Sequence, residues 1–300
     1  MSIVASILRT SYRGAGSKRT YALPPELFLP TARQINAKRS FSVPEGDGHY
    51  EKREIAGCEV AVIRRRTERS ERAVLFFPGG GMMLAPDKGD AKSLRRLSRA
   101  TDCDVWFPCL PLCTDHCVTE VYDAAYACYA EMISVYGGGN VSTCGFFSGG
   151  ALALGIAAHN SAQKSPLPQP RHIVAVSPMD LPWNKASKAR MRALNDRDVT
   201  IDYAYLETVE VFMRRGRDDI PRYMLSPSLG DWHGVGDIHF FFSEDEILYG
   251  ARPDLETACR AAGVPFTLTS RAGMVQSYCM MTSFPEGRKD FKKLAGLLRA

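Results

Sequence analysis

Short, mainly apolar segments recur along the chain and are separated by longer segments in which apolar and polar residues alternate at helical spacing. The first of them, AVLFFP at residues 73–78, is an unbroken apolar run of the kind that forms a parallel strand buried on both faces. Similar segments that predict further strands lie at residues 104–109, 141–144, 172–178, 237–243 and 265–270. We therefore expect a central sheet built mainly from these segments.

Helical periodicity fills most of the intervals between these strands. The clearest case is residues 118–136, where apolar side chains recur every three or four positions and form one stripe along a long helix. Other helices are predicted at residues 90–100 and 203–215, and a further one can begin at Pro253 and end at Gly263. Strands and helices thus alternate along most of the chain.

The C-terminal helix carries an explicit start signal. Ser283 and Glu286 have the spacing of a capping box, in which each side chain bonds the backbone N–H of the other residue. The apolar positions of this helix predict that it buries Phe291, Leu294 and Leu298. We therefore expect the helix to begin directly after Ser283.

Three segments depart from the strand–helix alternation. Residues 1–45 are helix-like and rich in proline, and they predict an N-terminal helical cap or arm. Residues 50–64 alternate around Ala56-Gly57 and predict an antiparallel hairpin at the edge of the sheet. Residues 183–233 are polar and mixed, which indicates a cap insertion within a main domain at residues 46–300.

The expected fold class is α/β, with a doubly wound, mostly parallel sheet, helices on both faces and a helical cap. Repeated strand–helix alternation implies parallel strands joined by right-handed crossovers. Ligands bind beyond the carboxyl ends of the strands in such a sheet. The loops after Pro78, Cys144, Ser243 and Ser270 should therefore converge on one pocket.

Composition and charge narrow the function classes. The net charge of +5 comes from 38 basic and 33 acidic residues in short, scattered runs, which argues against a nucleic-acid partner. No apolar run approaches the roughly 18 residues of a membrane span, and residues 1–14 lack the basic start and cleavage site of a signal peptide.

Nine cysteines, an odd number, favour a reduced, cytoplasmic chain. The spacing of Cys109, Cys113 and Cys117 matches no paired-cysteine site, so neither a metal nor another cofactor is expected.

A glycine turn at residues 145–150 lies between an apolar strand segment and an Ala/Leu-rich helix segment. This layout is that of a nucleophile elbow, in which small flanking residues let the chain turn sharply and expose a central serine. Gly145 and Gly149 occupy the flanking positions, but Phe147 occupies the centre. A serine follows one position later, at Ser148.

Four segments in order resemble motifs of the α/β-hydrolase fold superfamily, specifically of esterases similar to hormone-sensitive lipase. FFPGGGMML resembles the His-Gly-Gly-Gly oxyanion loop of that family, with Pro78 in place of the histidine. CGFFSGGALAL resembles the elbow, and SPSLGDWHGVGDIHFFFSEDEIL resembles the segment that leads to the catalytic acid. AGVPFTLTSRAGMVQSY resembles the segment that ends in Gly-Met-x-His. The resemblance runs from about residue 50 to the C-terminus and implies an α/β-hydrolase fold.

The resemblance also implies a degenerate catalytic triad. The nucleophile position falls on Phe147 and the general-base position on Gln276, while the acid position falls on Glu246, with Asp245 as an alternative acid. A phenyl ring cannot attack a carbonyl, and an amide cannot accept and return a proton near neutral pH. Around these positions, the residues expected to form the oxyanion loop or line the ligand pocket are Gly79, Gly80, Gly81, Met82, Met83 and Phe146.

Some residues offer alternative chemistry. Ser148 is an alternative nucleophile if the elbow slides by one residue, although Phe146 would then occupy a position that requires a small residue. His116 and His233 lie in loops and are the candidates for a substitute base. Cys144 and Cys279 are possible thiol nucleophiles, but no histidine is placed to activate them, and a buried structural role is expected.

The leading functional hypothesis is a carboxylesterase-like pseudo-hydrolase whose pocket binds a small apolar or acyl ligand or is plugged by Phe147. The second hypothesis is an active carboxylesterase that acts on short acyl esters through Ser148 or an unrecognised base. A third is an interaction protein that uses the cap surface. The expected partner is a small-molecule ligand or an ester substrate, and the sequence leaves the oligomeric state open.

Overall fold

An eight-stranded sheet forms the centre of the computed structural model, which describes residues 2–41 and 49–300. Each strand segment predicted from the sequence is present. The strands are β1 (His49–Ile55), β2 (Cys58–Arg64), β3 (Ala73–Phe77), β4 (Asp104–Pro108), β5 (Val141–Phe146), β6 (His172–Val176), β7 (Asp237–Ser243) and β8 (Phe266–Arg271).

The order of the strands across the sheet is β1-β2-β4-β3-β5-β6-β7-β8. The hairpin β1–β2 is antiparallel and lies at one edge, and β2 pairs antiparallel with β4. All the other pairs are parallel. The predicted fold class, a mostly parallel α/β sheet with an edge hairpin, is therefore confirmed.

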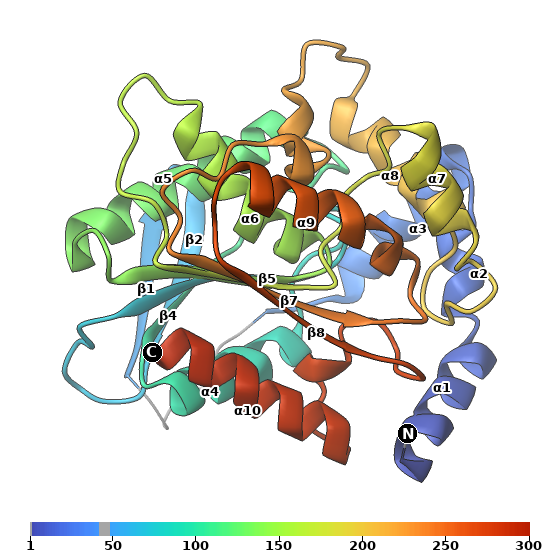
Figure 1. Ribbon diagram of the computed structural model, residues 1–300, viewed down its shortest axis with the longest axis horizontal. Helices are drawn as coiled ribbons and strands as arrows, with labels where there is room; N and C mark the ends of the chain where they lie inside the picture. Colours follow the sequence, from blue (N-terminus) through green and yellow to red (C-terminus); the bar gives the residue numbers. More distant parts are fainter. Residues whose placement is uncertain (1, 42–48) are drawn as a thin grey trace.

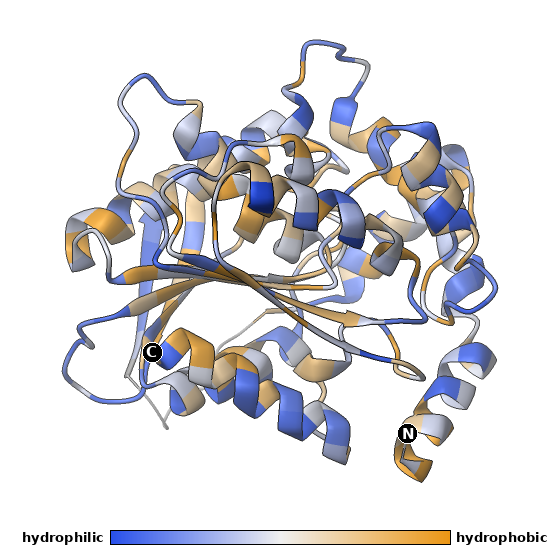
Figure 2. Cartoon of the chain, in the orientation of Figure 1, coloured by the Kyte–Doolittle hydropathy of each residue, from blue (hydrophilic) through white to orange (hydrophobic). Residues whose placement is uncertain are grey.

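Helices cover both faces of the sheet (Figure 1). One layer consists of α4 (Lys88–Thr101) and α10 (Pro285–Arg299), and the other consists of α5 (Val118–Tyr136), α6 (Ser148–Ser161) and α9 (Arg252–Ala261). Strand β3 contributes side chains to the cores on both faces of the sheet. Val74 and Phe76 pack in the α4–α10 core, and Leu75 and Phe77 pack in the α5–α6 core. Figure 2 shows hydrophobic residues concentrated along the sheet and on the helix faces that adjoin it.

The remaining helices lie together beyond the carboxyl ends of the strands and to one side (Figure 1). They are α1 (Ile3–Ala15), α2 (Ser17–Tyr21), α3 (Pro25–Lys38), α7 (Lys185–Arg192) and α8 (Ala204–Arg214). Helix α3 contacts α8 through Phe28, whose ring centroid lies 5.3 Å from that of Tyr205. The N-terminal helices therefore lie at the same end of the sheet as α7 and α8, the helices of the 183–233 segment (Figure 1).

The predicted capping box of the last helix is wrong. Helix α10 begins at Pro285, its N-cap is Phe284, and no side chain caps it. Proline suits the first helical turn because its φ is already fixed and it has no N–H to satisfy. The Glu286 carboxylate instead accepts hydrogen bonds from the backbone N–H (2.5 Å) and hydroxyl (2.8 Å) of Ser2. The burial predicted for this helix is confirmed at Phe291, Leu294 and Leu298.

The described helices include none that is both long and apolar enough to cross a membrane.

Candidate functional site

The turn between β5 and α6 has the backbone geometry of an elbow, and Phe147 is its apex. Phe147 has φ 57° and ψ −119°, a conformation that L-residues rarely adopt. Its N–H donates to the Val176 carbonyl at 2.9 Å, and its carbonyl accepts from the Met179 N–H at 3.0 Å. A β-carbon on Gly145 would collide with the Gly149 carbonyl, and one on Gly149 would collide with the end of β3. The two glycines are therefore required by the close approach of three backbone segments.

The Phe147 side chain is buried under an aromatic cluster from the cap helices. Its ring is 7% exposed and stacks on Tyr205 of α8, with ring centroids 6.0 Å apart and an interplanar angle of 22°. Tyr205 in turn packs against Tyr21 and Phe28, at centroid distances of 4.7 and 5.3 Å. These contacts hold the ring of Phe147 in the space above the elbow.

The glycine loop after β3 lies under the same cluster. Gly80 and Gly81 have φ of 106° and 66°, and Met82 also has a positive φ of 59°. A β-carbon on Gly81 would collide with the Tyr205 hydroxyl, which is buried and has no hydrogen-bond partner. A β-carbon on Gly79 would lie 2.7 Å from Cε2 of Phe146. Tyr205 and Phe146 therefore occupy the space that adjoins the predicted oxyanion loop, and Tyr205 was not anticipated from the sequence.

The cavity that remains beside the elbow is small. It has a volume of about 30 Å³, which is room for about one water molecule. Its lining is largely apolar and includes Gly79, Met82, Leu84, Ser148 and Leu152. A cavity of this volume is far smaller than the pockets that hold small-molecule ligands.

Ser148 begins α6, and its hydroxyl bonds the glycine loop after β3. The residue is 1% exposed, and its hydroxyl accepts the Met82 N–H at 3.3 Å. His116 and His233, the substitute bases suggested by the sequence, are exposed and bonded to Glu120 (2.8 Å) and Asp231 (2.5 Å). The structure therefore does not bring Ser148 together with either histidine.

The acid and base positions are connected through Ser177, which follows β6. The Ser177 hydroxyl donates to Oε2 of Glu246 at 2.9 Å and accepts the Ser277 N–H at 2.9 Å. Gln276, the residue before Ser277, is 7% exposed, and its Nε2 has no hydrogen-bond partner. Ser177 was missed in the sequence, where its only signal was a polar residue at the carboxyl end of a buried parallel strand.

The carboxyl group of Glu246 is buried, and only one of its two oxygens has a hydrogen-bond partner. The residue is 1% exposed, and its Oε1 has no partner. Burial raises the pKa of Glu246 well above its usual value, and the nearby Asp198 carboxylate raises it further. Burial also raises the pKa of Asp198, but this carboxylate accepts three backbone N–H bonds that favour its charged form, from Thr200, Ile201 and Ile247. The neutral form is therefore favoured more strongly at Glu246 than at Asp198.

The alternative acid, Asp245, has the opposite environment. It forms ion pairs with Arg9 (2.5 Å) and Arg197 and accepts the Gly273 N–H at 2.8 Å. Burial raises the pKa of Asp245, but the bonds to Arg197, Gly273 and Arg9 outweigh it, so the net shift is downward. Asp245 is therefore a charged group that joins the N-terminal helix α1 to the loop after β7.

Replacing Glu246 with Gln is expected to remove a pH dependence of stability. A raised carboxyl pKa means that the folded state binds more protons, so this contribution is fully present below the unfolded pKa and is lost as pH rises. We expect Glu246→Gln to stabilise the protein by about 1 kcal/mol or more at pH 8.5, with a smaller effect at pH 5, in urea unfolding.

Asp245→Asn is the matched control. The lowered pKa of Asp245 gives its contribution to stability the opposite pH dependence to that of Glu246. This variant should be destabilised at pH 8.5 and less so as the pH falls through the pKa of Asp245. An equal effect of Glu246→Gln at both pH values would contradict a raised pKa of Glu246.

The cysteines suggested as alternative nucleophiles are inert in this fold. Cys144 and Cys279 are fully buried, and burial raises the pKa of each thiol.

Among the described residues, the group whose donor atoms are close enough to hold a metal ion is His172, Asp237 and His239, which lies at the amino ends of β6 and β7. Cys109, Cys113 and Cys117 do not form such a group.

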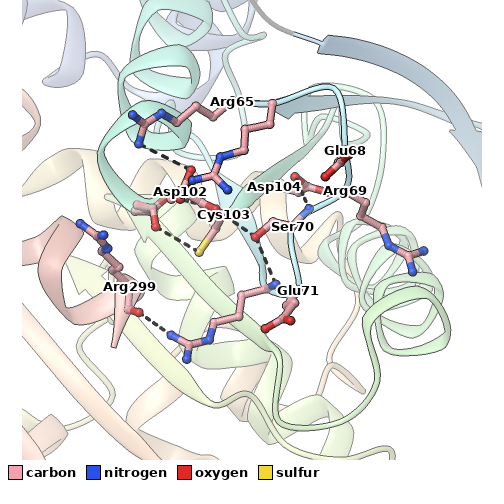
Figure 3. Close-up of a pocket in the computed structure, with 12 residues that line it drawn as sticks. Arg65, Glu68, Arg69, Ser70, Glu71, Asp102, Cys103, Asp104 and Arg299 are labelled. Carbon is pink, nitrogen blue, oxygen red and sulfur yellow. Dashed lines mark hydrogen bonds and ion pairs between the residues drawn. The ribbon is translucent and has the colours of Figure 1, made fainter.

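A second hollow lies at the opposite end of the sheet. It has a volume of about 360 Å³ and adjoins the 65–72 loop, the start of β4 and the C-terminal Arg299 (Figure 3). Arg66 pairs with Asp102 at 2.9 Å, and burial raises the pKa of the Cys103 thiol there. Because this hollow combines paired charges with an unreactive thiol, it does not have the composition of a hydrolase site.

Comparison with known proteins places the chain among esterase-like folds. A family model described as alpha/beta hydrolase fold matches residues 74–280. Similar solved structures include a putative esterase from Staphylococcus aureus, with 20% identity, a TM-score of 0.78 and coverage of 92% of both chains. The esterase EstE5 soaked with p-nitrophenyl butyrate has 20% identity and a TM-score of 0.81, over 100% of this chain and 98% of the other.

An esterase from the bacterial hormone-sensitive lipase family has 18% identity and a TM-score of 0.78, over 97% of each chain. No curated protein matches the sequence. At these identities the structural similarity establishes the fold, and the chemistry has to be argued from the residues at the site.

Proposed function

The chain belongs to the alpha/beta hydrolase fold family, and from this premise we propose that it is an esterase-like protein that does not hydrolyse esters. The observation that carries the proposal is the apex of the elbow. Phe147 occupies this position with its ring buried against Tyr205, so the elbow presents no nucleophile. Serine hydrolases need a nucleophile, a base and an oriented acid, and loss of the serine or histidine in subtilisin costs about 2 × 10⁶ in turnover.

The base position supports the proposal independently. Gln276 stands there, and its amide cannot act as a general base near neutral pH. The acid position, Glu246, keeps a carboxyl group, but burial and the nearby Asp198 carboxylate raise its pKa and so disfavour its charged form. The nucleophile and base positions thus both lack the functional group that ester hydrolysis needs.

Of the two states considered for the pocket, the plugged state has more support than an open ligand pocket. The cavity beside the elbow holds about one water molecule, and the Phe147 ring at the apex of the elbow is buried against Tyr205. The alternative of an active esterase through Ser148 has less support, since its hydroxyl faces the glycine loop and bonds the Met82 N–H.

The wild-type protein is therefore expected to be inactive towards p-nitrophenyl butyrate. We expect turnover no higher than that of a heat-denatured sample, and no covalent labelling by a serine-directed fluorophosphonate. Both measurements use the purified full-length chain. The matched control is Ser148→Ala, which should leave both results unchanged.

Two outcomes would overturn the proposal. The first is stoichiometric fluorophosphonate labelling that maps to Ser148. The second is ester turnover in the wild-type protein that disappears in Ser148→Ala. Either result would identify Ser148 as a nucleophile despite its buried position.

A further inference from the structure

Two histidines and an aspartate meet at the amino ends of β6 and β7, on the face of the sheet that α10 covers. His172 lies directly opposite Asp237 in the parallel register, and His239 follows Asp237 by two residues. Side chains two residues apart on a strand share a face of the sheet, and Val174 and Phe241, which share this face, pack in the α4–α10 core. Strand register therefore brings the three side chains together.

The cluster is separate from the esterase-like site. Four residue steps along β6 lead from His172 to Val176, a length of about 13 Å at roughly 3.3 Å per residue, and Ser177 and the elbow lie beyond that end. Nothing in the proposed function requires two histidines here.

The donor atoms of the cluster are close together. Nδ1 of His172 lies 2.6 Å from Oδ1 of Asp237, and Nε2 of His239 lies 3.1 Å from the same oxygen. All the donor atoms fall within 4.8 Å of one another. Ligands that share a tetrahedral ion at about 2.0–2.2 Å lie roughly 3.3–3.6 Å apart, so small side-chain shifts would place an ion between them.

Nε2 of His239 is the atom that the protein leaves unsatisfied. His239 is 4% exposed, and its Nδ1 pairs with the Thr267 hydroxyl at 2.8 Å. Nε2 lies 3.1 Å from Oδ1 of Asp237, but this contact lacks hydrogen-bond geometry, so Nε2 has no hydrogen-bond partner. A buried polar atom without a partner is costly, and a cation between Nε2 and the carboxylate would satisfy both.

We propose that His172, Asp237 and His239 form a binding site for a divalent transition-metal ion of the Zn²⁺ class. Two imidazole nitrogens and one carboxylate oxygen form a donor set that suits Zn²⁺, with water as the fourth ligand. The Asp237 side chain is 29% exposed and gives the ion a path from solvent. The site lies at the amino ends of β6 and β7 and does not depend on ester hydrolysis.

Binding at Nδ1 of His172 requires a change at its other nitrogen. Nε2 of His172 now accepts a hydrogen bond from Nε of Arg171 at 3.0 Å, so Nδ1 carries the proton and donates to Asp237. When Nδ1 binds the ion, the proton moves to Nε2 and Arg171 must release this nitrogen. Arg171 is thus a competitor of the metal, both by this bond and by its charge.

The test is a titration of the purified full-length protein with Co²⁺, followed by competition with Zn²⁺. We expect a single Co²⁺ per chain with the visible absorption of a four-coordinate nitrogen and oxygen site, displaced by Zn²⁺. Asp237→Asn, whose side chain is partly exposed and of the same shape, should weaken binding at least ~10-fold. His172→Gln and His239→Gln should do the same, with circular dichroism to verify folding.

The control is His233→Gln, because His233 also pairs with an aspartate two residues away but is exposed and lies outside the cluster. It should bind Co²⁺ like the wild-type protein, and Arg171→Gln should bind it more tightly. Equal binding by the wild-type protein and Asp237→Asn would overturn the proposal. So would thiolate-to-metal charge-transfer absorption, which would assign the ion to a cysteine.

Discussion

A variant that carries both Phe147→Ser and Gln276→His is expected to hydrolyse p-nitrophenyl butyrate at least ~100-fold faster than the wild-type protein. The backbone at position 147 already has the φ of 57° and ψ of −119° of an elbow, so a serine there needs no rearrangement of the turn. The change also removes the phenyl ring that fills the space above the elbow. A nucleophile and room for a substrate are thus introduced together.

The second substitution supplies a base next to the acid position, where Oε1 of Glu246 has no hydrogen-bond partner. Ser177 bonds both Glu246 and the backbone N–H of Ser277, which holds the 276–277 segment close to the carboxyl group. An imidazole at position 276 would give Glu246 a group whose positive charge it can stabilise. We therefore expect Gln276→His alone to be inactive and the pair to be active.

Tyr205 remains an obstacle in this double variant, because its hydroxyl occupies the space beside Gly81. Adding Tyr205→Phe is expected to raise activity further, since it frees the predicted oxyanion loop and removes a buried hydroxyl that has no partner. The control for the nucleophile is Phe147→Ala with Gln276→His, which should stay inactive. A folded double variant that neither turns over ester nor reacts with a fluorophosphonate would show that the loss of activity extends beyond positions 147 and 276.

Gly149→Ala is expected to destabilise the protein by about 3 kcal/mol or more, measured by urea unfolding at fixed pH. A β-carbon at this position would collide with the backbone carbonyls of Phe77 and Pro78. These atoms belong to the end of β3 and cannot rotate away as a flexible side chain could. Relief would therefore require β3, β5 and α6 to move apart.

Gly296→Ala is the matched control, since Gly296 lies inside helix α10 and an added β-carbon there meets no atom within 4 Å. It should stabilise the protein by about 0.5–1 kcal/mol, because alanine is the better helix former. A loss below about 1 kcal/mol for Gly149→Ala would contradict the tight packing of the elbow against β3.

Local sequence pattern was sufficient for most of the secondary structure. The run at residues 73–77 is apolar at each position because β3 is covered on both faces, and that burial is visible without any tertiary information. Helix α7 was not predicted, because only Met191 and Ser187 of its eight residues are buried and the segment has almost no apolar stripe. The capping box failed because Glu286 bonds Ser2, from the far end of the chain.

At the candidate site, too, some features could be predicted from the sequence and others could not. The identities of Phe147 and Gln276 already argued against ester hydrolysis, since chemical reactivity belongs to the residue type. The sequence did not predict that Tyr205 lies on Gly81, that Asp198 lies near Glu246, or that Ser177 connects the acid and base positions. Each of these contacts joins segments that are distant in sequence, and none has a local signal.

The sequence by itself therefore determined the fold class and the absence of a nucleophile at position 147 and of a base at position 276. Both can be read from short stretches of residues, because hydrophobic periodicity and side-chain chemistry are local properties. Only the tertiary structure decided how the space at the elbow is filled and which polar groups meet elsewhere. His172 and His239 are 67 positions apart from one another along the chain and adjoin only through the register of β6 and β7. Register and packing are set by contacts across the whole sheet, and no short stretch of residues contains them.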